Sequence, residues 1–127
     1  MTETAKKVLI VEDDASMREL LVMVFKDAGY AVAEAASGRL GLDRVREDTP
    51  DVIVTDLAMP DLGGFEFLRT LQQGETARIP VVILTAKRMP PAAIKEMQHE
   101  PNVKAYLVKP LQHTKLLAEV QRVLQGR

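Results

Sequence analysis

The chain has 127 residues, 46% of them apolar and 28% charged, a size and balance typical of one globular domain, so we expect residues 1–127 to form a single domain. Its formal net charge of -1 gives no electrostatic basis for nucleic acid or a membrane surface as a direct partner. The chain has no cysteine and no stretch near the roughly 20 apolar residues of a membrane span, which excludes thiol chemistry and favours a cytoplasmic protein.

Two patterns alternate along the chain. Short apolar runs rich in β-branched residues predict strands covered on both faces, and the segments between them carry apolar residues at helical spacing. In chain order we predict a strand at 8–11, a helix at 16–28, a strand at 30–33, a helix at 39–47, a strand at 52–55, a helix opening after 64, a strand at 81–84, a helix at 91–97, a strand at 106–108 and a helix at 112–124.

The first predicted helix begins with a capping box, in which the side chains of Ser16 and Glu19 satisfy backbone N–H groups at the helix N-terminus. A glycine at its end suits a helix C-terminus, because glycine adopts the left-handed conformation found there. The apolar stripe and the terminal glycine are Leu20, Leu21, Val24, Ala28 and Gly29.

Glycine and proline bound the other helices. The second helix stops before Pro50, and the third opens after Gly63-Gly64. Pro91 suits the first turn of the fourth helix, because N–H groups there have no partner inside the helix, but the pair Pro90-Pro91 should shorten or displace that helix. The third helix packs with Phe65, Leu68 and Leu71, and the fifth with Leu116, Leu117, Val120 and Leu124.

Alternating strands and helices predict an α/β layer fold. Parallel strands need long crossover connections, which are usually helices, so the sheet is expected to be parallel. In a doubly wound sheet, ligands bind beyond the carboxyl ends of the strands. The residues directly after each apolar run are therefore the candidates for a functional site.

Acidic residues occupy these strand ends. Glu12, Asp13 and Asp14 follow the first strand, and Asp56 follows the third. Several carboxylates at one point repel one another unless a hard divalent cation lies among them. Mg²⁺ is the expected ion, since it takes one or two carboxylates together with phosphate oxygens. The pattern therefore favours a site for a phosphoryl group.

Asp56 is the candidate nucleophile toward phosphorus. Aspartate can form an acyl phosphate, and this chemistry needs positioning and charge neutralisation more than a general base. Thr85 ends the fourth strand and Lys109 follows the fifth. The hydroxyl of Thr85 can donate a hydrogen bond to a phosphoryl oxygen, and Lys109 can supply a positive charge.

Four segments carry these residues in order: VLIVEDD over 8–14, TDLAMP over 55–60, LTA over 84–86 and YLVKP over 106–110. Together they resemble the receiver domains of bacterial response regulators, and the resemblance covers nearly the whole chain. It implies a flavodoxin-like, doubly wound fold with a five-stranded parallel sheet of order 2-1-3-4-5 sandwiched by five helices.

The resemblance also implies roles for the acidic residues. Asp56 is the phosphoacceptor, and Glu12 and Asp13 hold Mg²⁺ together with Asp56. Ala58 supplies a backbone carbonyl to the metal, whereas Asp14 falls outside the acidic pair. The peptide bond between Lys109 and Pro110 is expected to be cis.

By the same resemblance, phosphorylation changes a surface of the domain. Thr85 is drawn toward the phosphoryl group, and the ring of Tyr106 turns inward. This coupling reshapes the surface formed by the fourth helix, the fifth strand and the fifth helix, as a population shift biased by a local charge.

The implied function is a two-component switch that acts on no external substrate and slowly hydrolyses its own acyl phosphate. A sensor histidine kinase or phosphotransfer protein is the expected donor, and a downstream effector domain or protein is the expected recipient of the signal. No effector domain is expected within residues 1–127. A phosphorylation-dependent homodimer is left open.

Two other functions fit parts of the sequence. An Mg²⁺-dependent aspartyl-phosphate phosphatase begins with the same strand-end aspartate, but such enzymes usually carry a second acid two residues later, where this chain has Ala58. A receiver-like docking module that works without phosphorylation usually lacks the acceptor, an acid or the lysine. This chain keeps Asp56 and Lys109, which favours the phosphorylated switch.

Overall fold

The computed structural model describes residues 5–56, 64–85 and 90–126 of the chain, where strands and helices alternate. None of the helices in these ranges combines the length and apolar character that a membrane crossing needs. The elements are β1 (Lys7–Val11), α1 (Ala15–Asp27), β2 (Ala31–Ala35), α2 (Gly38–Glu47), β3 (Val52–Asp56), α3 (Gly64–Leu71), the short 3-10 helix η1 (Gly74–Arg78), β4 (Val81–Thr85), α4 (Pro91–Gln98), β5 (Val103–Val108) and α5 (His113–Gln125).

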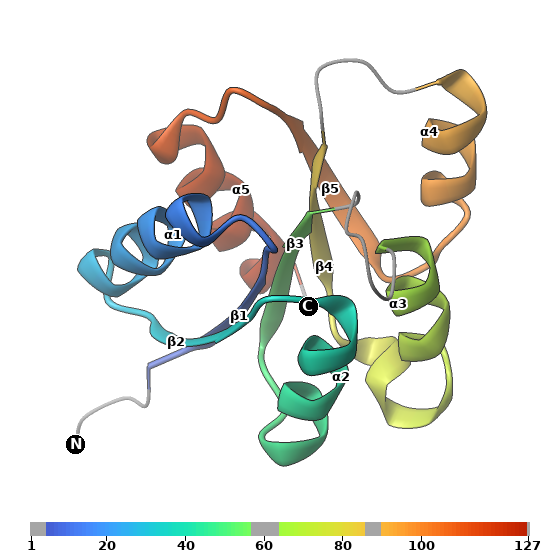
Figure 1. Cartoon of the computed structure of the whole chain (residues 1–127), viewed down its shortest axis with the longest axis horizontal. Coiled ribbons are helices and arrows are strands. Elements are labelled where there is room, and N and C mark those ends of the chain that lie inside the picture. The colour runs from blue at the N-terminus through green and yellow to red at the C-terminus, as the bar shows by residue number, and fades with distance from the viewer. Residues whose placement is uncertain (1–4, 57–63, 86–89, 127) are drawn as a thin grey trace.

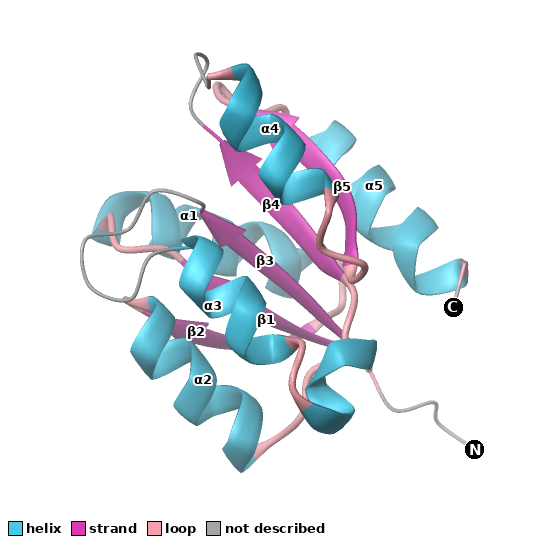
Figure 2. Cartoon of the chain, turned by 90° about the vertical axis from the view of Figure 1, so that its right-hand side faces the viewer, coloured by secondary structure: helices cyan, strands magenta, loops and turns pink. Residues whose placement is uncertain are grey.

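The five strands form one parallel sheet in the order β2-β1-β3-β4-β5, which confirms the predicted topology. The sheet lies in the middle of the molecule, with α1 and α5 on one face and α2 and α3 on the other (Figure 1). Figure 2, turned by 90°, shows α4 on the same side as α3. The chain therefore has the predicted α/β architecture.

Alternate side chains of each central strand enter two separate apolar cores. Val8 and Ile10 of β1 pack with α1 and α5, whereas Leu9 and Val11 pack with α2 and α3. Because helices cover both faces, these four side chains are at most 1% exposed. This double coverage explains why the central strands have continuous apolar runs in the sequence.

Helix α1 starts earlier than predicted. Asp14 is its N-cap, with its side chain accepting a hydrogen bond from the Met17 N–H, so the predicted capping box at Ser16 is wrong. An aspartate is as good a cap as a serine, and the chain turns into the helix directly after β1. At the other end Gly29 has φ +97°, the left-handed conformation expected of a glycine after a helix.

The buried stripe of α1 also differs from the prediction. Leu21 and Phe25 are buried in the core, but Leu20 is 40% exposed. With the helix beginning at Ala15, positions four residues apart face the sheet, and Leu20 lies beside that stripe. In α5, Leu116, Val120 and Val123 are buried, whereas Leu117 and Leu124 pack at the margin of the core.

The edge strands depart most from their predicted bounds. Strand β5 begins at Val103, earlier than the predicted 106. Exposed and covered residues alternate along this strand, and the exposed Lys104 interrupts the apolar pattern from which the start was predicted. Strand β2 extends to Ala35, beyond the predicted 33, and includes the exposed Glu34. Edge strands lie partly in water, so an apolar run underestimates their length.

Helix α4 begins at Pro91, as predicted, and ends at Gln98, one residue beyond the predicted end. Its Ile94 packs against the core that α2 and α3 share, and Glu96 forms an ion pair with Arg69 of α3. The side chain of Phe65, predicted to pack on α3, lies outside the described part of the structure.

Candidate functional site

The carboxyl ends of β1, β3, β4 and β5 meet at one edge of the sheet, because all strands run parallel. Glu12 and Asp13 follow β1, and Asp56 is the last residue of β3. One carboxylate oxygen from each of these three acids lies within 4.8 Å of the others. The sheet thus brings Asp56 next to two acids that lie more than 40 residues earlier in the sequence.

Burial makes this cluster electrostatically costly. Glu12 is 1% exposed and Asp56 is 6% exposed, whereas Asp13 lies on the surface. Two buried carboxylates with few water molecules around them repel strongly. Positive charge is therefore needed at this edge of the sheet.

Lys109 supplies one positive charge. Its Nζ donates a hydrogen bond to Asp56 Oδ2 at 3.0 Å and approaches Glu12 Oε1 at 3.5 Å. Burial alone would lower the pKa of Lys109, but the hydrogen bond and charge of Asp56, together with Glu12, outweigh burial and raise that pKa above its ordinary value. Lys109 therefore stays charged at neutral pH.

The main chain also fixes the position of Lys109. Its N–H donates to the carbonyl of Thr85 at 2.9 Å, directly beyond the pairing of Thr85 with Val108 between β4 and β5. The Lys109-Pro110 peptide bond is cis, as expected. The lysine is thus attached to the end of β4 as well as to its own strand.

Glu12 has an unusual protonation equilibrium. Burial is the main cause that raises its pKa to about 7, and the negative charge of Asp56 and a hydrogen bond with the Asp13 side chain act in the same direction. The N–H of Asp14, 3.1 Å from Glu12 Oε2, and the charge of Lys109 oppose this rise. Glu12 is therefore poised between its charged and neutral forms near pH 7.

The donor set fits a hard divalent cation. All three grouped ligand atoms are carboxylate oxygens, which Mg²⁺ and Ca²⁺ prefer over the nitrogen and sulfur ligands typical of zinc sites. Two of the carboxylates are buried and one is open to water, which suits an ion that retains part of its water shell. Ala58, predicted to add a backbone carbonyl, lies outside the described residues.

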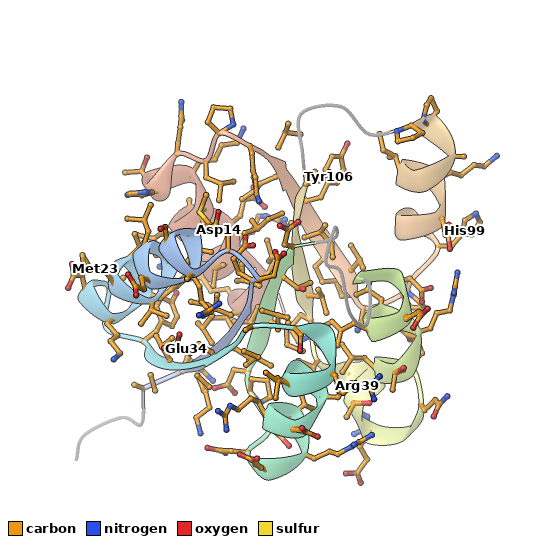
Figure 3. All side chains as sticks on the ribbon, viewed as in Figure 1. Asp14, Met23, Glu34, Arg39, His99 and Tyr106 are labelled. Carbon is orange, nitrogen blue, oxygen red and sulfur yellow. The ribbon has the colours of Figure 1, made fainter. Side chains whose placement is uncertain are left out.

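Thr85 and Tyr106 occupy neighbouring strands near this edge. Thr85 ends β4 and is 3% exposed, whereas Tyr106 lies opposite Ile83 on β5 and is 42% exposed. Figure 3 shows the Tyr106 side chain on the part of the molecule where β5 and α4 lie. The predicted roles of these two residues in a switch stay predictions.

Two residues near the site were not predicted to support it. Asp14, expected only to fall outside the acidic pair, caps α1 and donates its N–H to Glu12. Arg18 donates from Nη1 to the backbone carbonyl of Glu12 at 2.9 Å. Asp14 directly precedes a helical segment, and aspartate is a preferred N-cap residue, so the sequence contains a signal for this role. Nothing in the sequence marks Arg18.

Comparisons with known proteins agree with the fold described above. A family model described as response regulator receiver domain matches residues 8–121. Transcriptional regulatory protein AfsQ1 of Streptomyces coelicolor is 36% identical over 117 residues, which cover 92% of this chain and 50% of AfsQ1. Protein PilH of Pseudomonas aeruginosa is 33% identical over 121 residues, which cover 94% of this chain and 98% of PilH.

The DNA-binding response regulator MtrA of Mycobacterium tuberculosis is 31% identical over 125 residues, covering 98% of this chain and 53% of MtrA. The chain therefore spans about half the length of AfsQ1 and MtrA. Among solved structures, the chemotaxis protein CheY4 of Vibrio cholerae superimposes with a TM-score of 0.86 at 34% identity, covering 94% of this chain and 99% of CheY4.

The raised pKa of Glu12 predicts how stability depends on pH in the presence of a chelator. The folded protein binds a proton at Glu12 up to about pH 7, whereas the unfolded chain releases it near 4.5. The free energy of unfolding should therefore fall as pH rises between these values, by up to about 3 kcal/mol. In urea unfolding at pH 5 and pH 8, Glu12→Gln should gain stability relative to the unmodified chain at the higher pH. An equal difference between the two proteins at both pH values would contradict this.

Lys109 should stabilise the acidic cluster when no divalent cation is present. Lys109→Met removes the charged hydrogen bond to Asp56, and we expect a loss of roughly 1–3 kcal/mol in the free energy of unfolding with a chelator present. Mg²⁺ should then stabilise this variant more than the unmodified chain, because no ammonium group competes with the ion. Lys104→Met, which removes an exposed lysine from β5, is the matched control. Equal gains from Mg²⁺ in both variants would argue against the competition.

Proposed function

Because this chain belongs to the response regulator receiver domain family, we propose that it is a phosphorylation switch of two-component signalling, with residues 1–127 forming a single receiver domain. A sensor histidine kinase or phosphotransfer protein phosphorylates Asp56 in a reaction that needs Mg²⁺. The observation that carries the proposal is the position of Asp56, whose carboxylate lies 3.0 Å from Lys109 Nζ and within 4.8 Å of oxygens of Glu12 and Asp13.

In the proposed reaction an oxygen of Asp56 forms a bond to phosphorus while the bond from phosphorus to the donor's imidazole nitrogen breaks. The electron pair of that bond stays on the nitrogen, and Asp56 becomes an acyl phosphate. The Lys109 ammonium group forms an ion pair with one phosphoryl oxygen, and the Thr85 hydroxyl donates a hydrogen bond to another. Burial of Asp56 favours this transfer, because few water molecules compete for the carboxylate.

Glu12, Asp13 and Asp56 would hold the Mg²⁺, with the backbone carbonyl of Ala58 as a further proposed ligand. When bound, the ion supplies positive charge that offsets the negative charge building up on the phosphoryl oxygens. The raised pKa of Glu12 fits this assignment, since a carboxylate that is costly to ionise alone becomes favourable beside a cation.

The output of the proposed switch involves the surface of α4, β5 and α5. Thr85 and Tyr106 couple phosphorylation to this surface when Thr85 moves toward the phosphoryl group and the ring of Tyr106 turns inward. The 42% exposure of Tyr106 supports such a change, because an inward rotation would bury aromatic surface that now faces water. The change is a shift between two populations rather than a new fold.

The proposed partners are the phosphoryl donor and a downstream effector domain or protein. AfsQ1 and MtrA are named as a transcriptional and a DNA-binding regulator, but this chain spans about half of each, so direct nucleic-acid binding is not part of the proposal. The switch acts in the cytoplasm and turns over no external substrate. It slowly hydrolyses its own acyl phosphate. Pairing of two phosphorylated copies is compatible with it.

Labelling with acetyl phosphate tests the proposal. Incubation with Mg²⁺ should add one phosphoryl group by intact mass, and omission of Mg²⁺ or the change Asp56→Asn should abolish it. Asp27→Asn, at an exposed position on α1, is the matched control and should label normally. Labelling that persists in Asp56→Asn would show that Asp56 is not the phosphoacceptor. A folded protein that binds Mg²⁺ but is labelled neither by acetyl phosphate nor by phosphorylated histidine donors would favour a docking module that works without phosphorylation.

A further inference from the structure

Arg18 links three separate segments next to the acidic cluster. Its Nη1 donates to the backbone carbonyl of Glu12 at 2.9 Å, and its Nε donates to Glu34 Oε1 at 3.1 Å. Arg18 lies on α1 and Glu34 on the edge strand β2, so one guanidinium joins the end of β1 to both neighbours. The Arg18 side chain is only 19% exposed, although it is charged.

Further hydrogen bonds fix the residues between the end of β1 and the start of α1. The Asp14 N–H donates to Glu12 Oε2 at 3.1 Å, and the Asp14 carbonyl accepts the N–H of Arg18 at 2.9 Å. The N–H of Glu12 in turn donates to the carbonyl of Ala35 at 3.0 Å. Figure 3 labels Asp14 at the start of α1 and Glu34 on the neighbouring strand. Both backbone groups of Glu12 and one of its carboxylate oxygens are therefore held.

We propose that Arg18 is a positioning residue for the metal site: by holding the Glu12 peptide against Glu34, it keeps the carboxylates of Glu12 and Asp13 directed at the ion. The inference rests on the proposed function, because it assigns Mg²⁺ to that acidic cluster. Burial does not fix the position of Asp13, since this residue lies on the surface between Glu12 and Asp14. Its position depends on these two fixed neighbours.

The shape of the guanidinium suits this role better than a simple positive charge. Arginine presents several N–H groups in a fixed planar fork, so it can serve the Glu12 carbonyl and the Glu34 carboxylate together. Lysine carries the same charge on a flexible stem without that fork. Partners that orient metal ligands without touching the ion typically change metal affinity by about 10- to 100-fold when removed.

Charge and positioning predict opposite results for the loss of Arg18. As a cation 2.9 Å from the backbone carbonyl of Glu12, Arg18 repels an Mg²⁺ ion that approaches the acidic cluster, so removing its charge alone should tighten metal binding. As a positioning residue it lowers the cost of arranging the ligands, so its removal should weaken binding. The sign of the change in dissociation constant therefore separates the two roles.

The test is Mg²⁺ titration by calorimetry on the unmodified chain, Arg18→Ala and Arg18→Lys. We expect the dissociation constant to rise by about 10-fold or more in Arg18→Ala, and to rise also in Arg18→Lys, which keeps the charge but loses the fork. Arg44→Ala is the matched control, because Arg44 also donates to the backbone of β2, at the Glu34 carbonyl 3.2 Å away, and forms an ion pair with Glu47. This control should bind Mg²⁺ with unchanged or slightly higher affinity.

A second variant and a second readout guard against a general loss of structure. Glu34→Gln leaves Arg18 in place but weakens its outer partner, and should raise the dissociation constant by a smaller factor. The acetyl phosphate labelling rate of Arg18→Ala should be slow at low Mg²⁺ and approach that of the unmodified chain at saturating Mg²⁺. A purely structural defect would lower the rate at every Mg²⁺ concentration and would overturn the inference.

The proposed function and this inference fail in different ways. If the unmodified chain binds no Mg²⁺, both are overturned. If the unmodified chain binds Mg²⁺ and is labelled, and Glu34→Gln and the Arg18 variants bind it equally well or more tightly, only the positioning role of Arg18 is overturned.

Discussion

The interaction on which the site depends is the contact of Lys109 with the buried carboxylates of Asp56 and Glu12. Without a cation, this edge of the sheet would hold two nearly inaccessible negative charges side by side. The fold makes the contact possible, because β1, β3 and β5 run parallel and end together, and because the apolar cores on both faces keep the strands in place. Within the described residues, Lys109 forms ion pairs with two of the three grouped acids, so a further positive charge would be favourable there, and this is the physical basis of the proposed Mg²⁺ site.

The same strands connect this charged edge to the surface. Thr85 accepts the Lys109 N–H through its carbonyl and pairs with Val108, while Tyr106 lies two residues earlier on β5. Tyr106 and Val108 are 42% and 46% exposed, so the strand that leads to the lysine also presents apolar side chains to water. In the proposed switch, a structural change that follows a change of charge at Asp56 therefore crosses only β4 and β5 before it reaches an exposed surface.

Much of the fold and the grouping of the acids could be predicted from the sequence, because the strands buried on both faces leave continuous apolar runs and the acids stand directly after them. Glu12 and Asp56 were placed at strand ends in this way, and their roles in the site stay predictions. The helix start at Asp14 was missed because Ser16 offered a competing cap pattern three residues before Glu19. The start of β5 was missed because an edge strand needs no unbroken apolar run, as Lys104 shows. The contact of Arg18 with Glu12 and Glu34 depends on the tertiary arrangement of three elements, and no local pattern encodes it.

The most direct test of a metal site at these strand ends is an Mg²⁺ titration followed in amide ¹H–¹⁵N spectra of the ¹⁵N-labelled chain. The signals of Glu12, Asp13, Asp14 and Asp56 should shift together and saturate with one dissociation constant, because the ion enters between the carboxylates at the ends of β1 and β3. Shifts that do not saturate, or that spread over exposed acids elsewhere such as Asp43 and Glu47 on α2, would contradict a metal site at this edge of the sheet.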